Sequence, residues 1–169
     1  MSTELSVSGF SVRRNACVGE YRLTDIFVGL HYSSSLVRVF GSKAEMMKIL
    51  GHLKLRIEEH DSGLWLDRDT GTICIGRKQV SSAKSSFLYL DVIHVLVHVR
   101  QFLEGRELYD QAYEYVERPT ELEAYRYTVA EARKMGMNEG EILRYLRMDA
   151  ADDSELGKLI EKIGVRARR

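Results

Sequence analysis

The chain has little of several features that mark particular protein classes. Its 169 residues include one proline and two cysteines, Cys17 and Cys74, which stand far apart and outside any C-x-x-C pattern. We therefore expect reduced thiols, as in cytoplasmic proteins, and no zinc site built on cysteine. The first residues lack the apolar core of a secretory signal. No apolar run approaches the length of about 18 residues that spans a membrane, so no membrane association is predicted.

Charge of one sign is not in excess either. Lysine and arginine total 25, aspartate and glutamate also total 25, and hydrophobic residues make up 44% of the chain. Such a balance provides no overall field that would attract nucleic acid or a membrane surface. The length suits a single domain over residues 1–169 that is large enough to bury a core.

The hydrophobic pattern predicts a mixed α+β fold with a small antiparallel sheet. Residues 1–35 show no sustained period. The apolar run at 36–40 predicts a strand, and Ser42 with Glu45 has the spacing of a capping box that opens a helix to about Leu50. Three short alternating segments follow, and they predict an antiparallel meander with one buried face. These segments are 53–57, 64–66 and 73–75.

Helices dominate the rest of the chain. The polar segment 77–86 predicts a loop, and 87–104 predicts a helix that is buried on most sides and ends at Gly105. A second long helix begins near Pro119, either with Pro119 in its first turn or with Thr120 and Glu123 as a capping box. Asn138 opens a short helix to about Leu146, and Ser154 caps a last helix through Ile163.

Two histidines stand out on the first of these long helices. His94 and His98 are four residues apart, so they lie on one face, one turn above the other. Two imidazoles in this arrangement can bind one cation. The alternative is a pair of ordinary hydrogen-bonded histidines without a metal.

A carboxylate from the second long helix is the natural third ligand. Glu121 stands in the first turn of that helix, and Glu123 is its competitor. The two are about 200° apart around a helix, so only one can face the histidines. We favour Glu121, because Glu123 is also the capping-box partner of Thr120.

The order of these parts resembles the minimal zincin metallopeptidases of the gluzincin type. Within that group the chain is similar to compact ImmA/IrrE-type peptidases, whose third zinc ligand is a glutamate in an E-x-x-A motif like Glu121-Leu122-Glu123-Ala124. The resemblance covers residues 36–136 and leaves 137–169 as a C-terminal helical extension. It implies Zn²⁺ held by His94, His98 and Glu121, in a groove between the sheet and the two helices.

One residue of the family signature H-E-x-x-H is missing. The glutamate that follows the first histidine acts as the general base in that family, and here the position holds Val95. General-base catalysis contributes about 10²–10⁴-fold to a rate. Ordinary peptidase activity is therefore not expected. Asp91, on the same helical face, is a candidate fourth ligand, partner of an imidazole or displaced base, and Tyr125 is a candidate hydrogen-bond donor to an oxyanion.

We therefore expect a zinc-binding, metallopeptidase-like pseudoenzyme that binds a peptide or protein partner in its groove. Two other classes stay open. One is a structural or interaction domain without metal. The other, which the mixed charge disfavours, is a nucleic-acid-binding regulator that uses the basic residues of the C-terminal helices. These basic residues are Arg144, Arg147, Lys158, Lys162, Arg166, Arg168 and Arg169.

Overall fold

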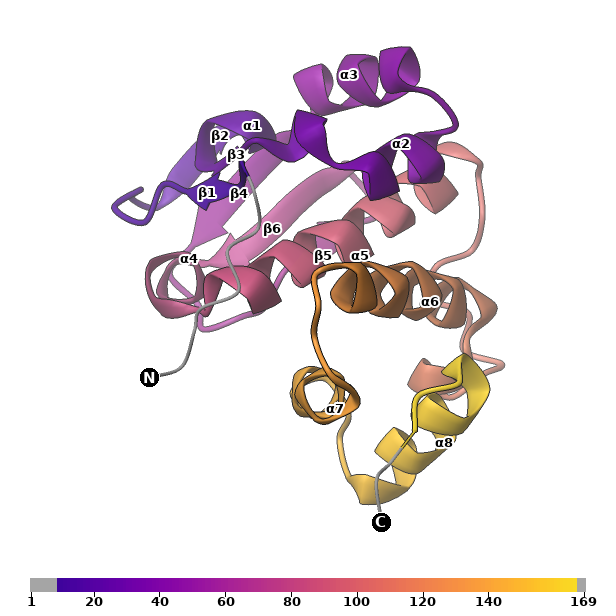
Figure 1. Cartoon of the computed structure of the whole chain (residues 1–169). Coiled ribbons are helices and arrows are strands. Elements are labelled where there is room, and N and C mark those ends of the chain that lie inside the picture. The colour runs from indigo at the N-terminus through magenta and orange to yellow at the C-terminus, as the bar shows by residue number, and fades with distance from the viewer. Residues whose placement is uncertain (1–8, 167–169) are drawn as a thin grey trace.

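The longest helix, α5 (Ser85–Leu103), runs through the middle of the protein between a sheet and a second long helix, α6 (Pro119–Lys134) (Figure 1). The computed structural model describes residues 9–166. Arg168 and Arg169, which were predicted as part of a basic tail, lie outside the described residues. The mixed α+β class predicted from the sequence is confirmed.

The main sheet has four strands in the order β2-β4-β6-β5. Their bounds are Gly19–Arg22, Lys54–Glu58, Thr72–Gly76 and Trp65–Asp67, respectively. Strands β2 and β5 lie antiparallel to their neighbours, but β4 and β6 are parallel. A meander would pair β4 with β5, so the predicted meander is wrong, because β4 pairs with β6 instead. Alternation of apolar residues shows which face of a strand is buried, but it does not show which other strand it pairs with. A two-stranded sheet of β1 (Ser11–Val12) and β3 (Phe27–Val28) lies beside it, with α1 (Leu23–Ile26) before β3.

The predicted strand at 36–40 is instead helix α2 (Ser34–Phe40). Ser33 caps this helix, because its hydroxyl oxygen accepts a hydrogen bond from the backbone N–H of Leu36. Its buried residues Leu36, Val39 and Phe40 recur at helical spacing. A five-residue segment with four apolar residues suits a buried strand and a buried helix turn equally well, so the pattern alone was ambiguous. Helix α3 (Lys43–His52) follows, capped by Ser42 as predicted.

The segment predicted as a loop at 77–86 contains helix α4 (Arg77–Ser82) and the start of α5. Val80 is its buried contact with the core. Helix α5 ends at Leu103, and Gly105 follows its cap residue Glu104 with a left-handed φ of 73°, as predicted. Helix α6 begins with Pro119 in its first turn, and Thr120 does not cap it. Two short 3₁₀ helices, η1 (Leu30–Tyr32) and η2 (Tyr115–Glu117), complete the connections.

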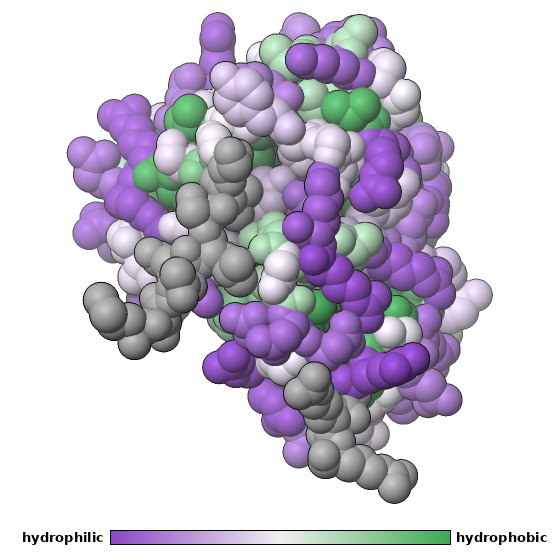
Figure 2. All heavy atoms as spheres, in the orientation of Figure 1, coloured by the Kyte–Doolittle hydropathy of each residue, from purple (hydrophilic) through white to green (hydrophobic). Residues whose placement is uncertain are grey.

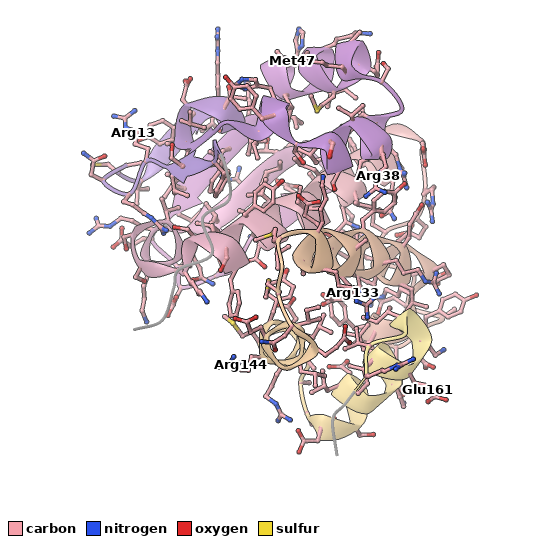
Figure 3. The ribbon with its side chains drawn as sticks, viewed as in Figure 1. Arg13, Arg38, Met47, Arg133, Arg144 and Glu161 are labelled. Atoms are coloured by element: carbon pink, nitrogen blue, oxygen red, sulfur yellow. The ribbon has the colours of Figure 1, made fainter. Side chains whose placement is uncertain are left out.

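The C-terminal extension consists of α7 (Glu139–Arg147) and α8 (Asp153–Ile163), which lie on the opposite side of α6 from the sheet (Figure 1). Asn138 and Glu141 form the predicted capping box. Asp152, rather than Ser154, caps α8. Arg133 of α6 binds Glu139 and the carbonyl oxygen of Gly164, so one side chain ties both C-terminal helices to α6 (Figure 3).

Two clusters of buried apolar residues make up the core. One lies between the sheet and helices α2, α3 and α5, and the other joins α6 to α7 and α8. By length and composition alone α5 could cross a membrane, but most of its apolar window is buried inside the protein, as in the central helix of a folded core. On the face that Figure 2 shows, hydrophilic side chains predominate and apolar atoms form only small areas.

Gly76, at the end of β6, lies against the connection between β4 and β5, and a substitution at Gly76 tests this close approach. Its backbone N–H donates to the carbonyl oxygen of Ser62, and an added Cβ would lie 2.2 Å from the carbonyl oxygen of His60. Gly76→Ala must therefore shift backbone, and we expect it to lower the free energy of unfolding by about 1–3 kcal/mol in urea denaturation.

Gly51→Ala is the matched control. Gly51 lies in α3 with nothing within 4 Å of an added Cβ. We expect this change to raise the free energy of unfolding by about 0.5–1 kcal/mol through helix propensity. Equal effects of the two variants would contradict the close approach at Gly76.

Candidate metal centre

His94 and His98 occupy successive turns of α5, and their side chains converge as their spacing predicts. The two Nε2 atoms are 3.0 Å apart, and both side chains are mostly buried. Buried β-branched and leucine residues surround them on the helix, which holds this face of α5 against the core. The two imidazoles therefore present their ring nitrogens to one point.

Glu121 reaches the same point from the first turn of α6. One of its carboxylate oxygens, Oε2, lies 3.0 Å from His94 Nε2 and 3.3 Å from His98 Nε2. The residue is 3% exposed. Glu123 faces another direction and binds Arg100 and Arg106. Glu121 and not Glu123 therefore faces the two histidines, and the assignment of Glu123 to a capping box is wrong.

The electrostatics of the three residues are coupled. Burial by itself would raise the pKa of Glu121, but hydrogen bonds from His94 and His98 outweigh it and hold this pKa well below its usual range. Burial would lower the pKa of His98, and the hydrogen bond with Glu121 raises it instead. Glu121 is thus an anion in a nearly closed site, and its position requires positive charge beside it.

This group can hold a metal ion. Two imidazole nitrogens and a carboxylate oxygen are ligands that transition metals accept, and they lie close enough to share one ion. Within residues 9–166 no other set of three His, Cys, Asp or Glu side chains meets this condition. Cys17 and Cys74 are free thiols away from the site, as the sequence indicates.

The centre lies in a cleft of about 300 Å³. Residues 63–66, which include the first two residues of β5 at the edge of the sheet, form one wall, and α5 with Glu121 forms another. Val95 lines this cleft beside His94 while being only 2% exposed. The position of the missing glutamate is therefore inside the cleft, and it carries an apolar side chain.

A third wall comes from the C-terminal extension, which the sequence did not predict. Tyr145, Met148 and Asp149 line the cleft from the end of α7 and the residues after it. Asp149 follows the last helical turn, in a polar stretch with no periodic pattern to mark it. The end of α7 and the residues after it thus form part of the cleft wall.

Asp91, a candidate catalytic residue, lines the cleft one turn before His94. It accepts a hydrogen bond of 2.8 Å from the Tyr145 hydroxyl. Burial raises the pKa of Asp91 to about 7, the nearby charge of Asp149 adds to this, and the Tyr145 hydrogen bond opposes it. Among the described residues its hydrogen-bond partner is this tyrosine and not an imidazole.

Tyr125, the other candidate, is fully buried and packs its ring edge-on against His94, with centroids 4.5 Å apart. Its hydroxyl donates to Asp149 Oδ2 over 3.3 Å. Burial raises the pKa of Tyr125 far above its ordinary value. Tyr115 lines the cleft instead, with its hydroxyl 3.2 Å from that of Tyr125.

Three of the basic residues in the described C-terminal helices are held in ion pairs. Arg147 pairs with Asp153, Lys158 with Glu114 and Lys162 with Glu117. Arg144 projects outward from α7 (Figure 3). These ion pairs neutralise charges that a phosphate backbone would need to meet.

The raised pKa of Asp91 predicts a pH-dependent stability. The unfolded carboxyl releases its proton near pH 3.8 and the folded one near pH 7, so its contribution is present below that window and is lost as the pH rises through it. Asp91→Asn removes this penalty. In chelator-containing buffer we expect the variant to gain about 1–2 kcal/mol of unfolding free energy at about pH 8 and little at about pH 4.

Asp69→Asn, at an exposed turn, is the control and should leave both values unchanged. Urea denaturation of the three proteins at both pH values measures the difference. A loss of stability in Asp91→Asn at the higher pH would contradict the assignment of a strained, buried acid.

Comparisons with protein-family models, with curated proteins and with solved structures give no match for this chain.

Proposed function

We propose that the protein binds one zinc ion through His94, His98 and Glu121. Tetrahedral zinc, with bonds of about 2.0–2.2 Å to nitrogen and oxygen, separates neighbouring donor atoms by about 3.3–3.6 Å. The three donor atoms here stand 3.0, 3.0 and 3.3 Å apart, close to the edges of such a tetrahedron. This triangle is the observation that carries the proposal.

The chemistry of the donors favours zinc over harder ions. Magnesium and calcium prefer sites made entirely of oxygen, whereas two imidazoles and one carboxylate suit zinc. A site with three protein ligands leaves one position of the tetrahedron open towards the cleft. Zinc in such a site supplies a Lewis acid when it is bound.

We propose further that the protein is a metallopeptidase-like binding protein and not a peptidase. A general base has to accept a proton within hydrogen-bond reach, and the Val95 side chain cannot accept one. Two other carboxylates line the cleft, Asp91 and Asp149, and each accepts a hydrogen bond from a tyrosine hydroxyl. Asp91 stands on α5 and Asp149 follows α7, and their hydrogen bonds to tyrosines support a structural or binding role.

The shape of the cleft supports a peptide as its occupant. One wall is the edge of the sheet, and an extended peptide can pair with an edge strand. Trp65 on that edge and Met148 on the opposite element are large apolar side chains, both partly exposed. Apolar walls with a few polar groups are typical of ligand-binding clefts.

Zinc binding is tested by equilibrium dialysis of the chelator-treated chain, followed by elemental analysis. We expect about one zinc per chain, because three protein ligands complete one site. His94→Ala and Glu121→Ala should each abolish this binding. His60→Ala, the same change at an exposed histidine, should leave it intact.

Circular dichroism of each variant separates loss of zinc from loss of fold. A native chain that binds no zinc would overturn the proposal and leave an interaction domain without metal. Zinc that persists at one equivalent in folded His94→Ala would place the site elsewhere.

The missing base is tested by restoring it. Val95→Glu should retain zinc and hydrolyse a mixed peptide library about 10²–10⁴-fold faster than the native chain, because it returns a general base to the cleft. Val95→Gln is the matched control, which introduces similar size and polarity without a base. Cleavage products are measured by mass spectrometry.

Trp65 is the only tryptophan of the chain and it lines the cleft, so its fluorescence reports binding without cleavage. The native chain should change this fluorescence with the peptide library and leave the peptides whole. Hydrolysis by the native chain at the rate of Val95→Glu would contradict the assignment as a pseudoenzyme.

A further inference from the structure

Gln101 lies one turn beyond His98 on α5 and is completely buried. A buried amide is costly unless its groups are hydrogen-bonded. Its nitrogen Nε2 donates to the carbonyl oxygen of Thr120 over 3.0 Å and to Glu123 Oε2 over 2.8 Å. Its oxygen Oε1 lies 2.8 Å from Nδ1 of His98. Every polar atom of this side chain is therefore engaged.

These partners fix the orientation of the amide. A carbonyl oxygen and a carboxylate can only accept hydrogen bonds, so the two N–H groups of Gln101 must face Thr120 and Glu123. The amide oxygen then has to face His98. A flipped amide would place its oxygen against two acceptors, which is repulsive.

The orientation of the amide decides which nitrogen of His98 carries a proton. Because an amide oxygen can only accept, Nδ1 of His98 must donate to it and hold the proton. In neutral His98 the lone pair is then on Nε2. Nε2 is the atom that faces Glu121 and His94. His94 has no equivalent support, since its buried Nδ1 has no hydrogen-bond partner among residues 9–166.

Glu123 holds the amide in place. Its two carboxylate oxygens accept from Arg100 and Arg106 as well as from Gln101, so two guanidinium groups fix the carboxylate. A continuous series of hydrogen bonds thus links the two arginines to His98 through Glu123 and Gln101. The two glutamates of Glu121-Leu122-Glu123 thus face different parts of the same centre.

We propose that Gln101, held by Glu123, is a positioning residue that fixes His98 in the tautomer with the proton on Nδ1 and the lone pair on Nε2. This form is the one that binds a metal through Nε2, so the inference rests on the proposed zinc site for its purpose. The hydrogen bond that sets it is made by the protein's own groups, Gln101 and Nδ1 of His98. Partners of this kind affect metal affinity by about 10–100-fold.

Gln101→Leu tests the proposal, because it keeps approximate size and removes the accepting oxygen. Two-bond ¹H–¹⁵N spectra of the chelator-treated chain report directly whether Nδ1 of His98 carries a proton. The native chain should show a protonated Nδ1, and Gln101→Leu a mixture of both tautomers. Competition with a chromophoric chelator should show zinc binding weakened about 10–100-fold.

Gln79→Leu is the matched control, because Gln79 lines the same cleft from α4 and makes no side-chain hydrogen bond within the described residues. It should leave the spectrum and the zinc affinity unchanged. If Gln101→Leu does not fold, the spectrum of Glu123→Gln decides, since it frees the amide to turn and should also give mixed tautomers.

The outcomes separate this inference from the zinc proposal. A native tautomer spectrum and native zinc affinity in Gln101→Leu would overturn the positioning role while leaving the zinc site intact. A native chain that binds no zinc, yet shows the Nδ1-protonated His98 and loses it in Gln101→Leu, would overturn the zinc proposal and support the positioning role.

Discussion

The packing of α5 against α6 is the contact on which both the core and the site depend. It buries the carboxylate of Glu121 beside His94 and His98, and it places the amide of Gln101 against the backbone of Thr120. Each of these polar groups would be costly in an apolar interior without the partner that the other helix supplies. The two helices are therefore held in one register by polar contacts as well as by apolar packing, because a shift along either axis would leave a buried charge alone.

The buried polar groups in this region are explained better by a functional site than by stability. Stability alone would favour apolar residues here, since buried ionic groups contribute little net stability compared with well-packed hydrophobic ones. The protein instead keeps an acid with a raised pKa, a nearly closed His-His-Glu group and a fully buried amide within one small part of the fold. Departures of this kind from the rules of a stable core concentrate at functional sites. Val95, at the position of the missing glutamate, is instead a buried apolar side chain, as are Leu66 and Leu108 of the same cleft.

The sequence predicted that His94, His98 and Glu121 meet, because helical geometry alone relates His94 to His98 and excludes Glu123 when Glu121 faces them. Local capping chemistry likewise located α3 and α7 through Ser42 and Asn138. Other features depend on contacts between distant segments. The parallel pairing of β4 with β6 and the helical state of residues 34–40 are set by their neighbours in the fold. Asp149 enters the cleft only because α7 packs beside α5, and no local pattern encodes this. The contact between Gln101 and His98 could have been predicted from the sequence, since a polar residue one turn after a histidine lies on the same face of a helix.

The three walls of the cleft come from successive parts of the chain, and this sets the order in which they are made. His94 and Glu121 are 27 positions apart, so synthesis of the chain completes the ligand set before α7 emerges. The wall that carries Tyr145, Met148 and Asp149 is added last. In the order of the chain, the three side chains of the candidate centre therefore precede the residues of the third wall, so a chain cut short after α6 would keep the former and lack that wall.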